Sequence, residues 1–330
     1  SSKSLDMKTV AYSIILQITS LVIAIVGVFL ISCSSFEDET TNTSSDYIST
    51  CSVHCGFKDS QGNLWFGTNK AGVFKYDGTA YQNYNLIGDC SNQVSCISED
   101  EYGNLWFGTT DGLCRYDGQD FSHIPIPWTD TTGIWLDEVY PIVNPNEVRS
   151  ILIDSKGTVW AGTNGNGVYR YDGSSFSAFL QKKGRKQVDG LHHNIISSMV
   201  EEADGTIWFT SMTHGGVVSY DGRQFKDVGI NQGLSDDMVL SSFVDKEGQV
   251  WFGSLGNRKG GLDCYDSKQG TFKTYREENG LCSNNVTSLF QDDDGLIWIG
   301  SQRGNLCSYD GSNFTSFRTE TGQILNGVNF

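Results

Sequence analysis

The sequence predicts an all-β fold, a β-propeller of four-stranded blades. Three regularities predict it: an acidic residue, a glycine and a tryptophan recur at fixed spacing, a Tyr-Asp-Gly step follows in most copies, and the segments between alternate apolar and polar residues. The glycine comes three places and the tryptophan six places after the acidic residue. Successive tryptophans lie 41, 54, 48, 43 and 47 residues apart, and a repeat of about that length is typical of propellers and solenoids. The tryptophans are Trp65, Trp106, Trp160, Trp208, Trp251 and Trp298.

One repeat, residues 92–121, shows the expected blade. Strands are predicted at 94–97, 105–109 and 112–116 and around Phe121, with turns at 100–103 and at Asp117-Gly118. Asp-Gly steps can take the positive φ angles that tight hairpin turns require. At Tyr265-Asp266 a serine replaces the glycine, which predicts a longer turn. One such sheet cannot bury both faces, whereas copies arranged radially can, with tryptophan and phenylalanine between them.

The number of blades follows from counting repeats. Six repeats are complete, and residues 320–330 align with 278–286, the lead-in to an innermost strand. The expectation is therefore a six-bladed ring or a truncated seven-bladed one.

The first 33 residues are predicted to be a signal peptide. Lys8 precedes an apolar run at 10–31 and then Leu30-Ile31-Ser32-Cys33, which resembles the lipobox of bacterial lipoproteins. Cys33 is then the lipidated residue. The alternative is an uncleaved transmembrane anchor, because the run is long enough to span a bilayer. Residues 34–46 are predicted to be a flexible tether and 47–330 the propeller. We expect a cell-envelope lipoprotein, at the outer membrane or in the periplasm. The acidic run at 37–39 resembles surface-export signals of Bacteroidetes lipoproteins, or is ordinary linker charge.

Charge and cysteines exclude some function classes. The formal net charge is −16, which argues against nucleic acid as a partner. There is no Cys-x-x-Cys pair, so a zinc site is not expected. Strand positions suggest small core residues at Cys96, Cys114, Cys264 and Cys307. Removal of Cys33 leaves eight cysteines, a number that permits disulfides without requiring them.

The unit Asp-x-x-Gly-x-Leu-Trp-Phe-Gly-Thr, followed by Tyr-Asp-Gly-x-x-Phe, resembles the two-component regulator propeller repeat over residues 53–317. The resemblance implies a periplasmic ligand-sensing region, often for carbohydrate, of a hybrid histidine kinase or cyclase. The sequence contains no kinase, cyclase or receiver motif, so signalling output is not implied. The expected function is an exported, lipid-anchored ligand-binding or sensor module. The alternative is a sensor fragment of a hybrid two-component histidine kinase.

Candidate binding residues lie in loops expected at one mouth of the ring, where second strands lead to third strands and blades lead to blades. The insertion at 124–147 holds all four prolines and three aromatic residues, suited to a sugar face or a protein. Its aromatic residues could instead fold back as a local plug. Basic and aromatic groups here would suit an oligosaccharide, an anionic small molecule or an envelope protein. The candidates are Trp128, Trp135, Tyr140, Arg149, His193, His214, Arg258 and Arg303.

Catalysis is the less favoured hypothesis. Streptogramin lyases are propellers with a histidine and a metal at this mouth, and His193 or His214 could act as a base. No second acidic-histidine cluster, serine elbow or phosphate loop accompanies them. The repeated Asp-x-x-Gly is predicted to be turn structure, and Asp292-Asp293-Asp294-Gly295 lacks the later glutamate of a calcium loop. We expect no catalytic residues, no metal and no cofactor.

Overall fold

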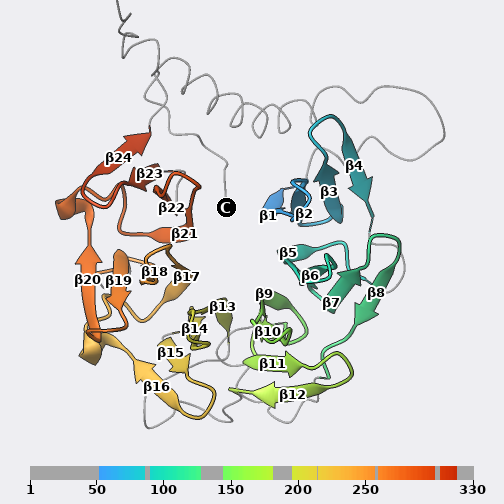
Figure 1. Cartoon of the computed structure of the whole chain (residues 1–330), viewed down its shortest axis with the longest axis horizontal. Coiled ribbons are helices and arrows are strands. Elements are labelled where there is room, and N and C mark those ends of the chain that lie inside the picture. The colour runs from blue at the N-terminus through green and yellow to red at the C-terminus, as the bar shows by residue number, and fades with distance from the viewer. Residues whose placement is uncertain are drawn as a thin grey trace, which may run out of the picture. The chain divides into compact units, whose positions relative to one another are not determined.

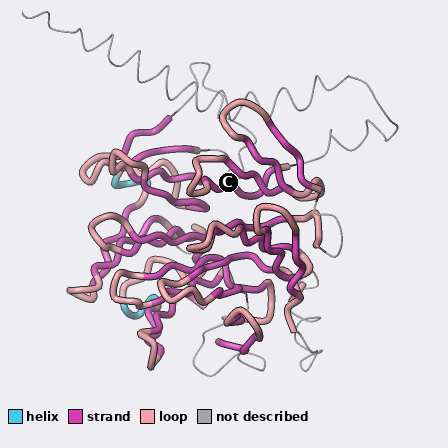
Figure 2. The backbone as a smooth tube through the Cα atoms, turned by 45° about the vertical axis from the view of Figure 1, so that its right-hand side comes forward, coloured by secondary structure: helices cyan, strands magenta, loops and turns pink. Residues whose placement is uncertain are grey.

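Six sheets of four antiparallel strands form a ring in the computed structural model, which describes residues 52–85, 90–127, 144–180, 195–213, 215–256, 259–301 and 305–317 (Figure 1). The predicted all-β propeller is confirmed, with six blades. Figure 2 shows that this part of the chain is strand and loop apart from two 3-10 turns, η2 (Ile230–Gln232) and η3 (Glu277–Asn279).

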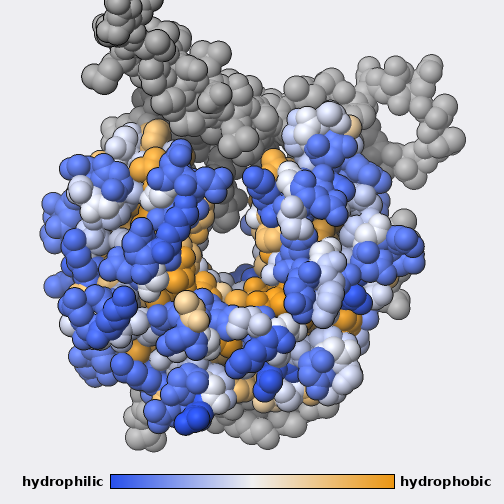
Figure 3. Space-filling view, in the orientation of Figure 1, coloured by the Kyte–Doolittle hydropathy of each residue, from blue (hydrophilic) through white to orange (hydrophobic). Residues whose placement is uncertain are grey.

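Every blade is a simple meander of four consecutive strands, numbered outward from the central opening. Contacts join the innermost strands in chain order, β1 to β5, β9, β13, β17 and β21. Figure 3 shows hydrophobic surface on the walls of the opening. The strands are β1 (Val53–Lys58), β2 (Leu64–Thr68), β3 (Val73–Tyr76), β4 (Tyr81–Tyr84), β5 (Val94–Glu99), β6 (Leu105–Thr109), β7 (Gly112–Tyr116), β8 (Phe121–Ile124), β9 (Val148–Ile153), β10 (Val159–Thr163), β11 (Val168–Tyr171), β12 (Phe176–Phe179), β13 (Ile196–Glu201), β14 (Ile207–Ser211), β15 (Gly216–Tyr220), β16 (Phe225–Val228), β17 (Val239–Val244), β18 (Val250–Ser254), β19 (Leu262–Asp266), β20 (Thr271–Tyr275), β21 (Val286–Gln291), β22 (Ile297–Ser301), β23 (Leu306–Tyr309) and β24 (Phe314–Phe317).

The Tyr-Asp-Gly steps form the hairpins between third and fourth strands. Of Asp117 and Gly118, only the glycine takes a positive φ, 96°. Asp117 instead accepts the backbone N–H groups of the next two non-glycine residues, at 2.9 Å each, which closes the turn. In blade 5 the chain between Tyr265 and Phe272 is two residues longer than that between Tyr116 and Phe121 in blade 2, but Asp266 and Thr271 add one more pair to the ladder. Four residues therefore connect the strands in both blades, so the prediction of a longer turn was wrong and the extra residues lengthen the strands.

Acidic residues of the first turn bind the tryptophan six places later, which explains the repeated spacing. The indole N–H donates to the carboxylate at 2.6–3.0 Å in all six blades. Burial alone would raise the pKa of Asp59, but hydrogen bonds from Trp65, from the Asn63 side chain and from backbone N–H groups hold it below its ordinary value. We call these the acid–Trp pairs: Asp59–Trp65, Asp100–Trp106, Asp154–Trp160, Glu202–Trp208, Asp245–Trp251 and Asp292–Trp298. The carboxylates thus have the predicted turn role.

The core lies between neighbouring blades, as predicted. The Trp160 ring lies 5.8 Å from Phe209 of the next blade, and Trp208 lies 5.5 Å from Phe252. Both phenylalanines are fully buried. Because each indole is fixed by its own turn, the same side chains order the turn and the packing between sheets.

Cys114 and Cys307 are completely buried in the core, as predicted, but they also form disulfides that the sequence only permitted. Cys90 is bonded to Cys114 and Cys282 to Cys307. Each bond ties the connection before a blade to the third strand of that blade, because Cys90 lies four residues before β5 and Cys282 four before β21. Cys96 and Cys264 are free, and Cys264 is buried as predicted.

Residues 1–51 lie outside the described residues, and with them the predicted signal peptide, Cys33, the whole tether at 34–46 and the first five residues of the predicted propeller range. Within the ranges that the structure describes, no helix has the length and apolar character needed to cross a membrane.

Candidate functional site

One face of the ring gathers the loops between second and third strands and the connections between blades. Backbone hydrogen bonds join them: Gly72 N–H donates to Asn92, and Gly112 N–H donates to Asn146, both at 2.9 Å. Asn164 also forms an isolated bridge with Ile195, which precedes the next blade. These loops therefore share one mouth of the ring, as expected from the repeat.

The opposite face carries the hairpin turns within each repeat. Ser60, in the first turn of blade 1, donates from its backbone N–H and its hydroxyl to Glu99 at the end of β5, at 2.7 Å each. Ser155, in the first turn of blade 3, contacts Glu201 at the end of β13 in blade 4 in the same way. The two faces thus differ in kind, with repeated turns on one and variable loops on the other.

Among the predicted binding residues, the structure describes Arg149, in the second position of β9. Its Nε donates to Glu147 at 3.1 Å, and Nη1 lies 3.1 Å from the sulfur of Met212 in the neighbouring blade. Asn164 donates to the other carboxylate oxygen of Glu147 at 2.7 Å. The Arg149 side chain is 37% exposed and that of Glu147 13%. A buried carboxylate therefore orients a partly exposed guanidinium at the mouth, where it can meet an oxyanion or a hydroxyl group.

The other predicted binding residues lie outside the described residues, so their placement stays a prediction. They are Trp128, Trp135, Tyr140, His193, His214, Arg258 and Arg303.

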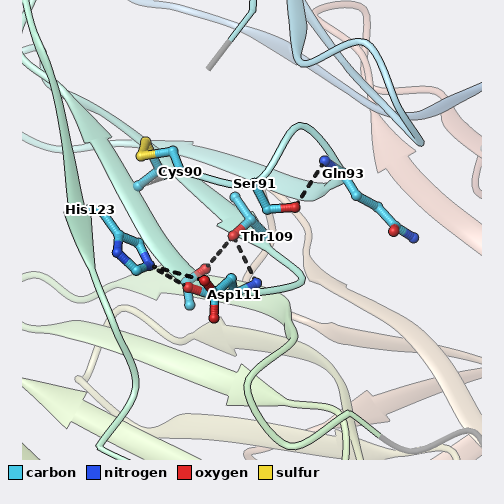
Figure 4. The surroundings of a disulfide bond; sticks show 8 residues. Cys90, Ser91, Gln93, Thr109, Asp111 and His123 are labelled. Atoms are coloured by element: carbon cyan, nitrogen blue, oxygen red, sulfur yellow. Dashed lines mark hydrogen bonds and ion pairs between the residues drawn. A yellow bond between two sulfur atoms is a disulfide. The ribbon is translucent and has the colours of Figure 1, made fainter. Parts of the chain in front are cut away.

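His123 is a mouth residue that sequence reasoning missed. It lies on β8, and its Nε2 contacts the backbone carbonyl of Asp111, with the Asp111 carboxylate 3.9 Å away (Figure 4). Figure 4 also shows the Cys90 disulfide beside this pair. The signal available in the sequence was its position at the end of a fourth strand, next to the loop that holds Asp111. The pair offers an imidazole and a carboxylate, but in the part of the chain that the structure describes no three such groups are clustered to hold a metal.

A groove of about 450 Å³ lies between blades 5 and 6 on the hairpin-turn face. One difference from blades 1 to 3 is the residue paired with the blade's tryptophan across the sheet. In blades 1 to 3 that residue is basic and covers the indole, as Arg115 does at 5.9 Å from Trp106. In blade 5 the partner of Trp251 is Cys264, whose short side chain leaves space.

The chemistry of this groove is polar. Trp251, Tyr275 and Tyr309 line it but are almost fully buried, so they offer little ring surface for stacking. Burial raises the pKa of the Cys264 thiol to about 12, so the thiol is no nucleophile at neutral pH. What remains accessible is mainly carboxylate and amide, together with the ammonium group of Lys273, which suits a small hydroxyl-rich molecule that is bound without reaction. The carboxylates and amides belong to Glu247, Gln249, Asp266, Gln269, Gln291 and Asp310, whereas Asp245 is buried.

Comparison with solved structures finds the same fold in extracellular domains. One, from a protein assigned to the hybrid two component systems of B. thetaiotaomicron, is 27% identical with a TM-score of 0.63, over 79% of this chain and 34% of that one. Another, from a one component system of the same organism, is 24% identical with a TM-score of 0.62, over 85% and 35%. This chain therefore spans about a third of the length of either domain.

An enzyme shares the fold alone. Virginiamycin B lyase of Staphylococcus aureus is 13% identical with a TM-score of 0.63, over 82% of this chain and 85% of that one. A search of curated sequences found no match.

The model of the family described as two component regulator propeller matches residues 47–70, 88–111, 143–165 and 280–303. Each match contains the first two strands of a blade and the turn of its acid–Trp pair, in blades 1, 2, 3 and 6. On these four matches, the chain carries two-component regulator propeller repeats, and it resembles at 27% identity an extracellular propeller of a hybrid two component system.

Proposed function

We propose that this chain is an exported, lipid-anchored propeller that binds a ligand at the loop-bearing mouth and acts as a sensor or interaction module of the cell envelope. The observation that carries the proposal is the Arg149 guanidinium, held by Glu147 in a half-exposed position at that mouth. An arginine oriented before binding loses less conformational freedom when a ligand arrives.

The ligand class follows from the groups that the mouth offers. A guanidinium binds carboxylates and vicinal hydroxyls, and His123 adds an imidazole group on the same face. The aromatic candidates Trp128 and Trp135 would supply the ring surface that sugars need. We infer that the ligand is an acidic or neutral oligosaccharide, or the glycan or peptide of an envelope protein.

An exported location agrees with the cysteines. Disulfides form and persist in oxidising compartments and are rare in the cytosol. Two bonds occupy equivalent places in blades 2 and 6, and a 27% identical domain is extracellular in its own protein. Lipidation of Cys33 would then hold the propeller at the membrane through the tether.

The test is calorimetric titration of the purified full chain with acidic and neutral oligosaccharides. Saturable binding without turnover is expected, and Arg149→Ala should weaken it about tenfold or more, by loss of a charge-assisted hydrogen bond. The matched control is Arg223→Ala, in the β15–β16 turn on the opposite face, which should bind as wild type does. Equal affinities of the two variants, or consumption of the oligosaccharide, would contradict the proposal.

A further inference from the structure

Tryptophans of the first five blades pack against the following blade. Trp65 lies 5.9 Å from Tyr116, Trp106 lies 6.0 Å from Tyr171, and Trp251 lies 5.9 Å from Tyr309, each pair measured between ring centroids. The indoles of these five blades are at most 5% exposed. Each of these interfaces is thus closed by the tryptophan of one blade and at least one aromatic ring of the next.

Trp298 of blade 6 departs from this rule. Its ring neighbours among the described residues, Phe290 at 6.2 Å and Phe317 at 5.1 Å, belong to its own blade. Phe290 is 54% exposed and Phe317 42%. Blade 6 therefore has an apolar face, defined by Phe290, Trp298 and Phe317, that receives no described aromatic ring from another blade. Around the ring, blade 6 is followed by blade 1 (Figure 1).

Blade 1 shows the complementary feature at the interval between blades 6 and 1. Phe66 is half-buried, whereas its equivalents Phe107 and Phe252 are fully buried. Figure 3 shows hydrophobic surface on both walls of the opening as they approach this interval. An exposed apolar face is usually covered by another segment of the protein or by a partner.

The sequence itself contains a segment with the features of that cover. A glycine precedes a β-branched residue by six places at four junctions: Gly88–Val94, Gly190–Ile196, Gly233–Val239 and Gly280–Val286. In every case the β-branched residue is the first residue of an innermost strand, and it is completely buried. Gly322 and Val328, which lie outside the described residues, repeat the spacing a fifth time.

At three of these junctions the buried β-branched residue packs against a glycine in the second strand of the preceding blade, and we call this position its seat. A Cβ on Gly67 would come within 2.7 Å of Val94, and a Cβ on Gly253 within 2.5 Å of Val286. Only glycine leaves room for the incoming side chain. By strand register Gly300 is the equivalent residue in blade 6, because it pairs with Ser288 as Gly253 pairs with Ser241.

We propose that residues 322–330 pack as an additional inner strand on the apolar face of blade 6, with Val328 seated against Gly300. The strand would run beside β21 as β21 runs beside β17, and it would cover part of the face that Trp298 presents. The proposal is independent of the ligand-binding function, because the face involves neither Arg149 nor the mouth.

Disulfide trapping tests the seat directly. At the β5–β9 interface the sulfur of Cys96, the equivalent of Ser288, lies 3.8 Å from the carbonyl oxygen of Val148, the equivalent of Val328. The variant Ser288→Cys/Val328→Cys should therefore form an intramolecular bond on mild oxidation, found by mass spectrometry of the linked peptides. Ser288→Cys/Asn329→Cys is the matched control, since Asn329 would point to the other side of the strand.

Equal linkage in the two variants, or none in either, would overturn the proposal. A bond between two chains would overturn it in favour of a second copy as the occupant of the face.

Amide hydrogen exchange gives an independent reading. Val328→Asp would place a charge against an apolar seat, so the strand should detach and exchange in β21 should speed up by about tenfold or more, while β5 stays unchanged. Unaltered exchange in β21 would contradict the proposal even if the variant folds fully.

Discussion

The indole nitrogen of Trp251 donates a hydrogen bond of 2.7 Å to one carboxylate oxygen of Asp245. The other oxygen accepts the backbone N–H groups of Glu247 and Gln249 at 3.0 and 2.7 Å. One side chain therefore closes the β17–β18 turn and aims the ring at blade 6, where it meets Tyr309. Turn chemistry and packing between blades depend on each other through this pair.

Loss of one acid–Trp pair should destabilise the whole ring. Asp100→Ala leaves the buried indole N–H of Trp106 without its acceptor, which costs about 1–3 kcal/mol, and also removes the turn bonds to the backbone. Urea denaturation measures the change in the free energy of unfolding. Asp117→Ala, in the exposed hairpin of the same blade, is the control and should cost clearly less. A similar loss in both variants would mean that the indole bond contributes nothing.

The buried carboxyl of Asp263 should make stability depend on pH. Burial raises its pKa above the ordinary value, although Ser235 and Thr274 donate hydrogen bonds to it. The folded chain then binds this proton more tightly than the unfolded chain, and the resulting stability is lost as the pH rises through the folded pKa. Asp263→Asn has no charge to bury, so it should exceed wild type in stability at about pH 7 and show no such gain at about pH 3. Thermal unfolding at both values checks the sign, and a gain confined to acid pH would refute it.

Each disulfide should contribute a loop-closure term to stability. The Cys90–Cys114 bond spans 24 residues, which corresponds to about 3 kcal/mol. Cys90→Ser/Cys114→Ser should be destabilised by that order, and its remaining response to reductant should come from Cys282–Cys307. The free thiol Cys264 provides the control, because Cys264→Ser should keep the full response to reductant. Wild-type protein with identical urea curves in the presence and absence of reductant would show that neither bond forms.

Lipidation should require Cys33. Cells expressing the full chain with radiolabelled palmitate should label the wild-type protein and leave Cys33→Ala unlabelled, because the thiol is the acceptor of the lipid. Cys51→Ala, beyond the tether, should label normally. Incorporation into Cys33→Ala at the wild-type level would rule out the lipoprotein.

Two tryptophans should separate binding from stability. Trp135→Ala should weaken ligand binding by about 2 kcal/mol or more, as an aromatic anchor would, with little change in melting temperature. Trp106→Ala should open a cavity between blades 2 and 3 and cost about 3–5 kcal/mol of stability. Calorimetric titration and thermal unfolding of both variants measure the two effects. Comparable unfolding of Trp135→Ala would show that the 124–147 insertion is a structural plug.

Blades and turns could be predicted from sequence because their determinants are close together. The acid–Trp pairs span six residues and the Tyr-Asp-Gly turns fewer, so spacing alone reveals them. The disulfides could not be found in this way. Cys90 and Cys114 belong to different segments and become neighbours only when strand register is known. Comparison between repeats could have revealed the pairing. Ser235 and Asp263 occupy in blade 5 the places that Cys90 and Cys114 occupy in blade 2, and they are hydrogen bonded there at 2.6 Å.

The groove and the mouth show the same limit. The groove is lined by Cys264, which pairs with Trp251 on the neighbouring strand, and a list of motifs does not contain this pairing. At the mouth, Arg149 was predicted from its residue type and loop position, but its orientation depends on Glu147 and Asn164, which come from a connection and from a different loop. Residue type was enough to predict Arg149 as a candidate binding residue. The carboxylate of Glu147 that orients it could be identified only from the fold.

Every acid–Trp pair closes within a single repeat, and this has an evolutionary consequence. Gain or loss of one whole repeat keeps each carboxylate with its own indole, and the new neighbour still supplies an aromatic ring to receive it. An insertion or deletion that cuts between Asp245 and Trp251 instead leaves a turn without its closing group and an indole N–H without an acceptor. Selection should therefore tolerate changes in copy number and free variation of the mouth loops, while it purges length changes inside the six-residue span.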